Sequence, residues 1–179
     1  MFEKDYKIPS KSNYTKWSQG ENTIRILSNP IKGYEWWIDG KTSDGKEIRM
    51  PKRTPMDVEI PLEQVPDPEA IKHFWAFIVW NYDKNMLQIM EITQKGIQKA
   101  ILSLDRSKGW GDPKNYDLSI TKEGEGMETK YFVNPLPPKT LDKSIKEKYE
   151  ASSIKLEALF KGEDPFKGKE DVDPDDIKL

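Results

Sequence analysis

The 179-residue chain contains no cysteine and only one histidine, His73. Without cysteine it forms neither disulfides nor thiolate metal sites, which fits a reducing compartment. A single histidine also excludes a histidine-rich zinc site. No apolar run approaches the roughly 20 residues that span a bilayer, and residues 1–14 lack the apolar segment of a signal peptide. We therefore expect a cytoplasmic protein with no cofactor, no metal and no membrane partner.

Apolar residues are scarce as well, at 35% of the chain against 34% charged residues. A chain of this length and composition is expected to form one domain with a modest core and much solvated surface. Six tryptophans are more than such a core needs, so we predict that some of them lie at the surface. The six are Trp17, Trp36, Trp37, Trp75, Trp80 and Trp110.

The net charge of −2 is unevenly distributed along the chain. Residues 162–179 contain three basic and seven acidic residues, a net charge of −4, so the rest of the chain carries +2. Such asymmetry is found in nucleic-acid-binding proteins whose tail competes with the polyanion or recruits partners. We predict a disordered acidic tail over residues 162–179. Its candidate partner-binding residues are Asp171, Asp173, Asp175 and Asp176.

Hydrophobic alternation predicts strands over residues 23–28 and 33–40. The segment "DGKTSDGKEIRM", which begins at the end of the second strand, carries two Asp-Gly pairs, and this dipeptide is typical of tight hairpin turns. The next stretch has five prolines between residues 51 and 68, which indicates an extended loop. We place this proline-rich insertion at residues 51–72.

The strongest strand signal is at residues 73–83, which are rich in aromatic and β-branched side chains, with a hairpin partner at 86–93. An apolar stripe at helical spacing then predicts a helix over residues 94–105. Two further strands, joined by the turn "EGEG", follow before residue 139. Residues 140–161 carry one modest apolar face and predict a C-terminal helix.

This order of elements is that of the OB-fold, a mainly β architecture. We therefore predict a five-stranded barrel over residues 1–139 with its helix between strands 3 and 4. A short mixed sheet with a helix on one face would give a similar pattern.

Both faces of the strand at residues 73–83 carry large aromatic side chains, because side chains alternate along a strand. A barrel has one interior, so one row must point outward. We assign Trp80 and Tyr82 to the exterior because they lie at the polar end of the strand. The alternative is a small second core covered by the proline-rich insertion.

The segment "GYEWW" raises the same question, since Tyr34 and Trp36 share one face and Trp37 lies on the other. We expect one of the two tryptophans to be exposed. Cations interleave with these rings in and near the same hairpin, which suits single-stranded DNA because bases stack on rings while Lys and Arg follow the phosphates. Any single cation fits an ordinary solvated face equally well. The cations are Arg25, Lys32, Lys41, Lys46, Arg49, Lys52 and Arg53.

Catalytic signals are weak. The chain has no Cys/His pair, and "GEGMETK" lacks the spacing of a phosphate-binding loop and lies between strands. The carboxylates of Glu91, Asp112 and Asp117 fall on different predicted elements, so nothing supports a two-metal centre. We expect that the protein is not an enzyme and that His73 is a structural or surface residue.

Three long blocks, "FWAFIVWNY", "EITQKGI" and "WGDPKNYDLSITKEGEGMETKY", resemble the single-stranded DNA-binding proteins of tailed bacteriophages. The resemblance covers about residues 14–139. It implies an OB-fold that binds single-stranded DNA without sequence readout and serves DNA replication, recombination and repair in the cytoplasm of the infected host. Some relatives carry a cysteine-based zinc element at the position of the insertion, which this chain lacks.

Carried over to this chain, the resemblance makes Arg25, the rings of "GYEWW", Trp80 and Tyr82 candidate DNA contacts. Trp110 has two interpretations, a plug over the barrel end, which we favour, or a stacking platform. The full candidate set is Arg25, Lys32, Tyr34, Trp36, Trp37, Arg49, Lys52, Arg53, Trp80, Tyr82 and Trp110.

The acidic end is similar in kind to tails that reach replication or recombination proteins, although it lacks the aromatic-proline terminus of the bacterial versions. Two other classes of function stay open. One is a protein-interaction module of a phage replisome or particle with no direct DNA binding, whose exposed aromatic side chains meet a protein. The other is a small nuclease or recombination accessory enzyme.

Overall fold

The computed structural model describes residues 12–166, in which a mainly β fold carries two α-helices. This confirms the predicted class. The strands are β1 (Gly20–Ile26), β2 (Ile31–Lys41), β3 (Glu47–Pro55), β4 (Lys72–Asn81), β5 (Met86–Ile92), β6 (Leu118–Glu123) and β7 (Lys130–Pro135). The α-helices are α1 (Lys95–Arg106) and α2 (Lys143–Ala151).

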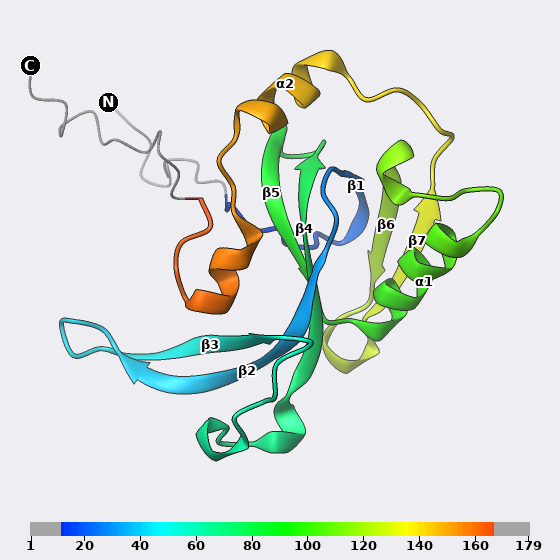
Figure 1. Cartoon of the computed structure of the whole chain (residues 1–179). Coiled ribbons are helices and arrows are strands. Elements are labelled where there is room, and N and C mark those ends of the chain that lie inside the picture. The colour runs from blue at the N-terminus through cyan, green and yellow to red at the C-terminus, as the bar shows by residue number, and fades with distance from the viewer. Residues whose placement is uncertain (1–11, 167–179) are drawn as a thin grey trace, which may run out of the picture.

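All seven strands belong to one antiparallel sheet in the order β3-β2-β4-β1-β6-β7, with β5 paired to β4. The central strand β4 pairs with β2 along its first half, where Ile31 lies opposite Ala76, and with β1 along its second half, where Arg25 lies opposite Trp80. Beyond β4, strands β2 and β3 project from the body as a two-stranded arm (Figure 1).

The sheet is open, so the predicted closed barrel of five strands is not what the pairing shows. Helix α1 lies between the fifth and sixth strands, not between the third and fourth. The difference arises because residues 47–55 pair with β2 from Lys41↔Glu47 to Gly33↔Pro55. Pro51 and Pro55 fit there since β3 is an edge strand, where proline is tolerated. The insertion is therefore a shorter loop over residues 56–71.

The main core fills the space between the sheet and α1. Ile97 and Ile101 of α1 are buried against apolar side chains of β1, β4, β5 and β6, including Phe77 and Val79 of β4. The predicted helical stripe is thus confirmed. Side chains at i and i+4 share one helix face, which explains why these two isoleucines enter the core together.

A second core lies on the opposite face of β4. Phe74, Ala76 and Ile78 pack there against the C-terminal 3₁₀ helix Leu156–Lys161, which follows α2 (Figure 1). Trp80 is in the same row and only 3% exposed. Assigning it to an exposed exterior was wrong. The alternative of a second core is correct in kind, although the C-terminal segment contributes the covering residues instead of the insertion.

The predicted helix at residues 140–161 is broken into α2 and the 3₁₀ turn. Asp142 caps α2 by accepting a hydrogen bond from the Ser144 N–H at 2.8 Å. Residues 162–166 close this segment, since the Lys155 N–H donates to the Pro165 carbonyl at 2.8 Å. Residues 167–179, with the tail aspartates, lie outside the described residues.

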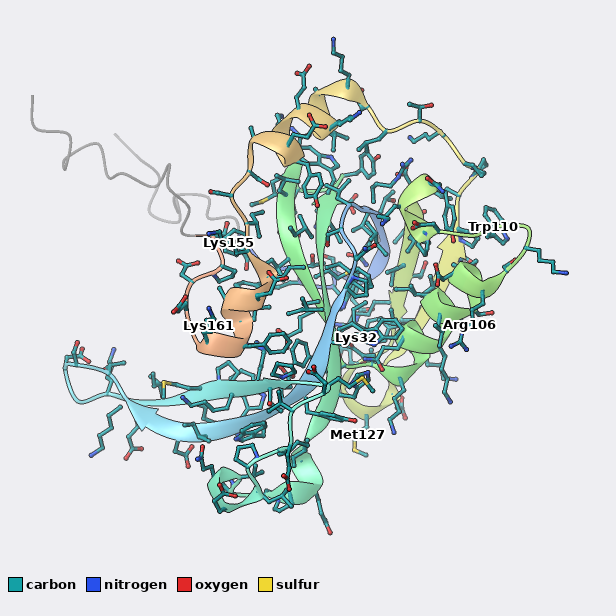
Figure 2. The ribbon with its side chains drawn as sticks, in the orientation of Figure 1. Lys32, Arg106, Trp110, Met127, Lys155 and Lys161 are labelled. Carbon is teal, nitrogen blue, oxygen red and sulfur yellow. The ribbon has the colours of Figure 1, made fainter. Side chains whose placement is uncertain are left out.

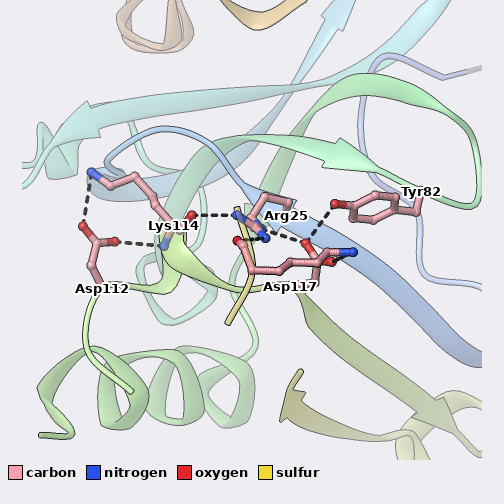
Figure 3. A network of polar contacts seen from close by, with 6 residues as sticks. Arg25, Tyr82, Asp112, Lys114 and Asp117 are labelled. Carbon is pink, nitrogen blue, oxygen red and sulfur yellow. Dashed lines mark hydrogen bonds and ion pairs between the residues drawn. The ribbon is translucent and has the colours of Figure 1, made fainter. Parts of the chain in front are cut away.

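A buried ion pair ties β1 to Asp117, the residue that precedes β6 (Figure 3). The Arg25 Nε donates to Asp117 Oδ1 at 2.7 Å, and its two terminal nitrogens donate to the carbonyls of Lys114 and Lys139. Asp117 also accepts from the Tyr82 hydroxyl at 2.9 Å and lies 3.0 Å from Lys139 Nζ. Arg25 is 1% exposed and each of its three nitrogens has an acceptor, so it joins β1 to these residues and is not free to contact DNA.

Burial alone would raise the pKa of Asp117, but hydrogen bonds from Lys139, Arg25 and Tyr82 outweigh it and hold this pKa below its usual range. Burial, followed by the hydrogen bond to Asp117, raises the pKa of Tyr82 to about 12. The phenol therefore remains a hydrogen-bond donor throughout the neutral range.

Replacing Asp117 by Ala should destabilise the fold by about 3–5 kcal/mol, because Arg25 is left buried without its counter-charge. The lowered pKa of Asp117 means that its contribution is present at neutral pH and is lost as the pH falls through the folded-state value. The variant should therefore lose part of the acid sensitivity in denaturant unfolding. Glu123→Ala, which removes an exposed carboxylate at the end of β6, is the matched control. If Asp117→Ala lowers the free energy of unfolding no more than the control does, Asp117 does not stabilise the fold through Arg25.

Candidate nucleic-acid interface

Three half-buried rings form a row across β2 and β4 on the face that also carries α1. The register places Tyr34 opposite His73 and Lys32 opposite Trp75, so these four side chains share one face. The Tyr34 and His73 ring centroids are 5.3 Å apart, and Trp75 meets Phe77 edge to face at 6.2 Å. We call Tyr34, His73 and Trp75 the aromatic ladder.

Hydrogen bonds fix two of the ladder rings, those of His73 and Trp75, in place. The Trp75 indole N–H donates to His73 Nε2 at 3.1 Å, so this nitrogen is an acceptor and the ring proton is on Nδ1. His73 Nδ1 in turn donates to the Gly33 carbonyl at 2.8 Å. These bonds use the ring edges, and the three rings of the ladder each keep part of their surface exposed.

Positive charge borders the ladder. Lys32, labelled in Figure 2, is exposed near the start of β2, and Lys52 of β3 is exposed opposite Trp36 on the same face. Neither lysine forms an ion pair with another residue in the range 12–166. The acidic residues of β2, Glu35 and Asp39, lie on the other face because side chains alternate. The ladder face of β2, β3 and β4 thus combines rings and cations without a carboxylate.

A hollow of about 260 Å³ continues the ladder toward α1. Its wall is mainly apolar, with Trp75 and Phe77 at one side and Ile101 and Leu102 of α1 at the other. Lys32 and Lys114 line it together with Asp105 and Asp112. The Lys114 ammonium lies 3.5 Å from Asp112, so Lys32 is the cation at this hollow that has no carboxylate partner.

The predicted contacts divide between the two faces of the arm. Lys32, Tyr34, Trp36 and Lys52 lie on the ladder face, although Trp36 is only 4% exposed and its indole nitrogen has no hydrogen-bond partner within residues 12–166. Trp37 lies on the opposite face and is 45% exposed. One tryptophan of the pair is therefore exposed, as expected. Arg49 accompanies Trp37, with Asp39 at 4.0 Å.

Tyr82 and Trp80 flank a separate hollow of about 460 Å³ beneath α2. The Lys139 ammonium lies 5.5 Å from the Tyr82 ring and that of Lys148 lies 5.2 Å from the Trp80 ring. The tyrosine hydroxyl is bound to Asp117. These rings are already covered by cations of the chain itself, so they are weaker candidates for base stacking than the ladder.

Trp110 lies on the loop after α1, beyond Arg106 (Figure 2), and is 37% exposed. It meets Tyr116 edge to face at a centroid distance of 5.3 Å. The Tyr116 hydroxyl donates to the Gly111 carbonyl at 2.9 Å and holds the loop in place. The ring thus packs on the edge of the main core while it keeps a third of its surface exposed.

Arg53 lies between the carboxylate of Glu91 and the carboxyl group of Glu35 at the base of the arm. Its Nη2 donates to Glu91 Oε2 at 2.8 Å, and its Nε lies 3.3 Å from Glu35 Oε2 without hydrogen-bond alignment. Both Arg53 and Glu35 are largely buried. Arg53 therefore holds β3 against β5 and is not a free DNA contact.

Sequence reasoning missed two members of the ladder. Trp75 falls in the row assigned to the barrel interior, and His73 was expected to be structural or on the surface. Alternation does place His73 and Trp75 in one row, but only the register between β2 and β4 brings that row beside Tyr34. Sequence patterns predicted only residues 86–93 as a pairing partner of the strand at residues 73–83, and they did not predict that β2 pairs with β4.

Among residues 12–166, none of the helices has the length and apolar character that crossing a membrane requires. Within the same residues, no group of three or more His, Cys, Asp or Glu side chains is arranged to hold a metal ion.

The chain is similar to a protein of Escherichia phage T5 named "Probable ssDNA-binding protein". The two are 25% identical over 145 residues, which cover 70% of this chain and 56% of the phage T5 protein. The match therefore spans little more than half the length of that relative. No protein-family model and no solved structure matches the chain.

The protonation state of Glu35, at the base of the arm, can be tested through the pH dependence of stability. Its burial, followed by the neighbouring Glu91, raises the pKa of Glu35 to about 8, so the side chain is neutral at pH 7. A carboxyl with a raised folded-state pKa stabilises the fold fully below its unfolded value, and this contribution is lost as the pH rises toward about 8.

Replacing Glu35 by Gln should therefore flatten the fall in stability between pH 5 and pH 8.5. At the upper end the variant should exceed the wild type by about 1 kcal/mol or more in urea unfolding. Glu47→Gln, at an exposed position of β3, is the control. Parallel pH profiles for wild type and Glu35→Gln would show that Glu35 is ionised in the folded protein.

Proposed function

We propose that this protein binds single-stranded DNA without reading its sequence and coats it, with no catalytic step. The observation that carries the proposal is the aromatic ladder, in which three rings on one face are bordered by Lys32 and Lys52 and by no carboxylate of the three strands. The similarity to a phage T5 protein named as a probable ssDNA-binding protein supports the same class.

The chemistry of the ladder suits unpaired bases. Stacking on an aromatic ring contributes about 1–3 kcal/mol per base and tolerates any sequence, because every base has a π-face. Lys32 and Lys52 would lie along the phosphates, and their neutralisation releases counterions, so affinity falls with salt. A duplex hides its base faces, which gives the ladder a preference for single strands.

We further propose that β1, β4, β5, β6 and β7 form an OB-type unit, with the arm as an insertion between its first two strands. Within this unit α1 lies between the third and fourth strands, the order found in OB-folds. In that arrangement the long connection between the first two strands supplies part of the oligonucleotide site. The ladder, which combines β2 with β4, occupies such a position.

The proposal extends to the biological setting. We propose a role in phage DNA replication, recombination and repair in the host cytoplasm. We also propose contacts with replication or recombination proteins through the acidic residues of the chain end. Those residues, Asp171, Asp173, Asp175 and Asp176, lie outside the described range.

Titration with oligo-dT while tryptophan fluorescence is recorded tests the function directly. We expect strong quenching, with an affinity that falls steeply between low and high salt. A protein-interaction module with no DNA binding would leave the fluorescence unchanged. Cleavage of the strand on addition of Mg²⁺ would instead identify a nuclease, and either result would contradict the proposal.

Replacing Tyr34 by Ala should weaken oligo-dT binding by about 1–3 kcal/mol, because one stacking surface is lost. Lys32→Glu should weaken binding and also reduce its salt dependence. Both are measured by the same titration, after thermal unfolding has verified the fold.

The matched controls are Phe132→Ala and Lys146→Glu. Phe132 is 47% exposed on β7 at the far end of the sheet, and Lys146 is exposed on α2. Tyr34→Phe, which keeps the ring, should bind like the wild type. Equal losses in the ladder variants and in the controls would remove the ladder from the binding site.

A further inference from the structure

The loop over residues 56–71 joins β3 to β4 and is strongly acidic. It contains five carboxylates and no Lys or Arg, so its net charge is −5. None of the five forms an ion pair with any residue between positions 12 and 166. The five are Asp57, Glu59, Glu63, Asp67 and Glu69. Such a loop repels a DNA strand, which makes it unsuited to the interface proposed above.

The same loop exposes large apolar side chains. Met56, Val58 and Leu62 are 52%, 51% and 58% exposed. Exposed apolar surface of this kind often marks a site of interaction with another molecule. The loop is nevertheless ordered by two short 3₁₀ turns, Leu62–Gln64 and Pro68–Ala70, and by the buried side chain of Val65. It therefore presents a fixed surface of carboxylates and apolar groups, which we call the acidic loop.

The outer face of α1 has the opposite charge. The helix carries three exposed cations, and the turn that follows adds a fourth. Asp105 is the single acidic residue of the helix. These cations are likewise without an ion-pair partner in residues 12–166, and Arg106 points away from the body in Figure 2. The cations are Lys95, Lys99, Arg106 and Lys108.

A shallow, open hollow lies on this face. It is lined by Lys99 and Arg106 on either side of Leu102, with Ser103 and Ser107. The face therefore offers an apolar centre with cations around it. This is the complement of an exposed apolar side chain, such as Leu62, on a loop that carries five carboxylates.

The acidic loop and the C-terminal half of α1 adjoin different parts of the aromatic ladder. The loop leads directly into β4 next to His73, whose carbonyl accepts a hydrogen bond from Gln98 in the first half of α1, while Leu102, one turn further along the helix, lines the hollow that continues from Trp75. A strand that follows the ladder from His73 to Trp75 therefore passes from the loop toward the C-terminal half of α1. On one such strand, the loop of one copy would face the α1 helix of the next.

We propose that successive copies of this chain contact each other head to tail on single-stranded DNA, with the acidic loop of one copy docked on the α1 hollow of its neighbour. Because two different surfaces meet, the contact does not close on itself as a two-fold dimer and repeats along the strand. The inference rests on the proposed function, since the DNA aligns the copies. The contact weakens as salt screens its charges.

A charge exchange tests the contact. Glu59→Lys with Glu63→Lys reverses the loop, and Lys99→Glu with Arg106→Glu reverses the helix face. The measurement is native mass spectrometry on an oligo-dT long enough for several copies, with less protein than is needed to fill every strand. With the wild-type protein, most strands should carry either no protein or a full set of copies. Each reversed variant should give mainly singly occupied strands, with the preference for adjacent copies reduced about tenfold or more.

The combined variant carries both reversals and has the same net charge as the wild type. It should recover the filled strands, because lysines of the loop now face glutamates of the helix. Failure of the combined variant to recover, or clustering that persists in both single reversals, would overturn the proposal. The same holds if the wild-type protein fills strands at random.

Two controls separate this contact from DNA binding itself. Glu125→Lys with Glu128→Lys reverses the other exposed acidic turn, and Lys146→Glu with Lys155→Glu removes cations elsewhere; both should cluster as the wild type does. An oligo-dT that holds one copy reports affinity without neighbours. If the helix reversal weakens this single-copy binding as much as clustering, α1 is a DNA surface and the proposal is wrong. If the wild type does not bind the short strand, the proposed function fails first.

Discussion

The burial of β4 on both faces is the constraint on which the rest of the molecule depends. One face of this strand packs on the α1 core and the other on the C-terminal segment. Most of its aromatic and aliphatic side chains are therefore used in packing, and Trp80 is one of them. Only the beginning of the strand, at His73 and Trp75, keeps rings half-exposed. The candidate interface is located there because neither cover reaches it fully.

Buried and exposed charges have different roles in this structure. Arg25 and Arg53 are buried and neutralised by carboxylates, which makes them part of the framework. Lys32 and Lys52 remain exposed beside the rings. The acidic residues of the loop over positions 56–71 lie at one end of this face instead of on it. A chain with a net charge near zero can in this way offer a cationic strip to a polyanion while it keeps acidic surface for protein contacts.

Local patterns in the sequence predicted the elements better than their arrangement. The strand at residues 73–83 and the α1 stripe were correct because alternation and helical periodicity report burial directly. The strand β3 was missed since its prolines suggest a loop, and only an edge position makes them compatible with pairing. Arg25 and Trp80 were taken for DNA contacts because residue type does not reveal a buried partner such as Asp117 or a covering helix.

The ladder illustrates the same limit. Tyr34 and Lys32 were recognised by their type, whereas His73 and Trp75 became part of the candidate site only through the register between β2 and β4. This pairing joins residues about 40 positions apart in the sequence, and it depends on where β2 turns from β4 into the two-stranded arm. No local signal in "GYEWW" or "HFWAF" contains that information.

Ultraviolet cross-linking of oligo-dT to the full chain, followed by mass spectrometry of the linked peptides, tests the central claim most directly. We expect thymine adducts on Tyr34 and on the segment with His73 and Trp75, and we expect salt to suppress them together with binding. Adducts confined to Phe132, or to the Trp80 and Tyr82 region beneath α2, would contradict the assignment of the ladder as the DNA interface.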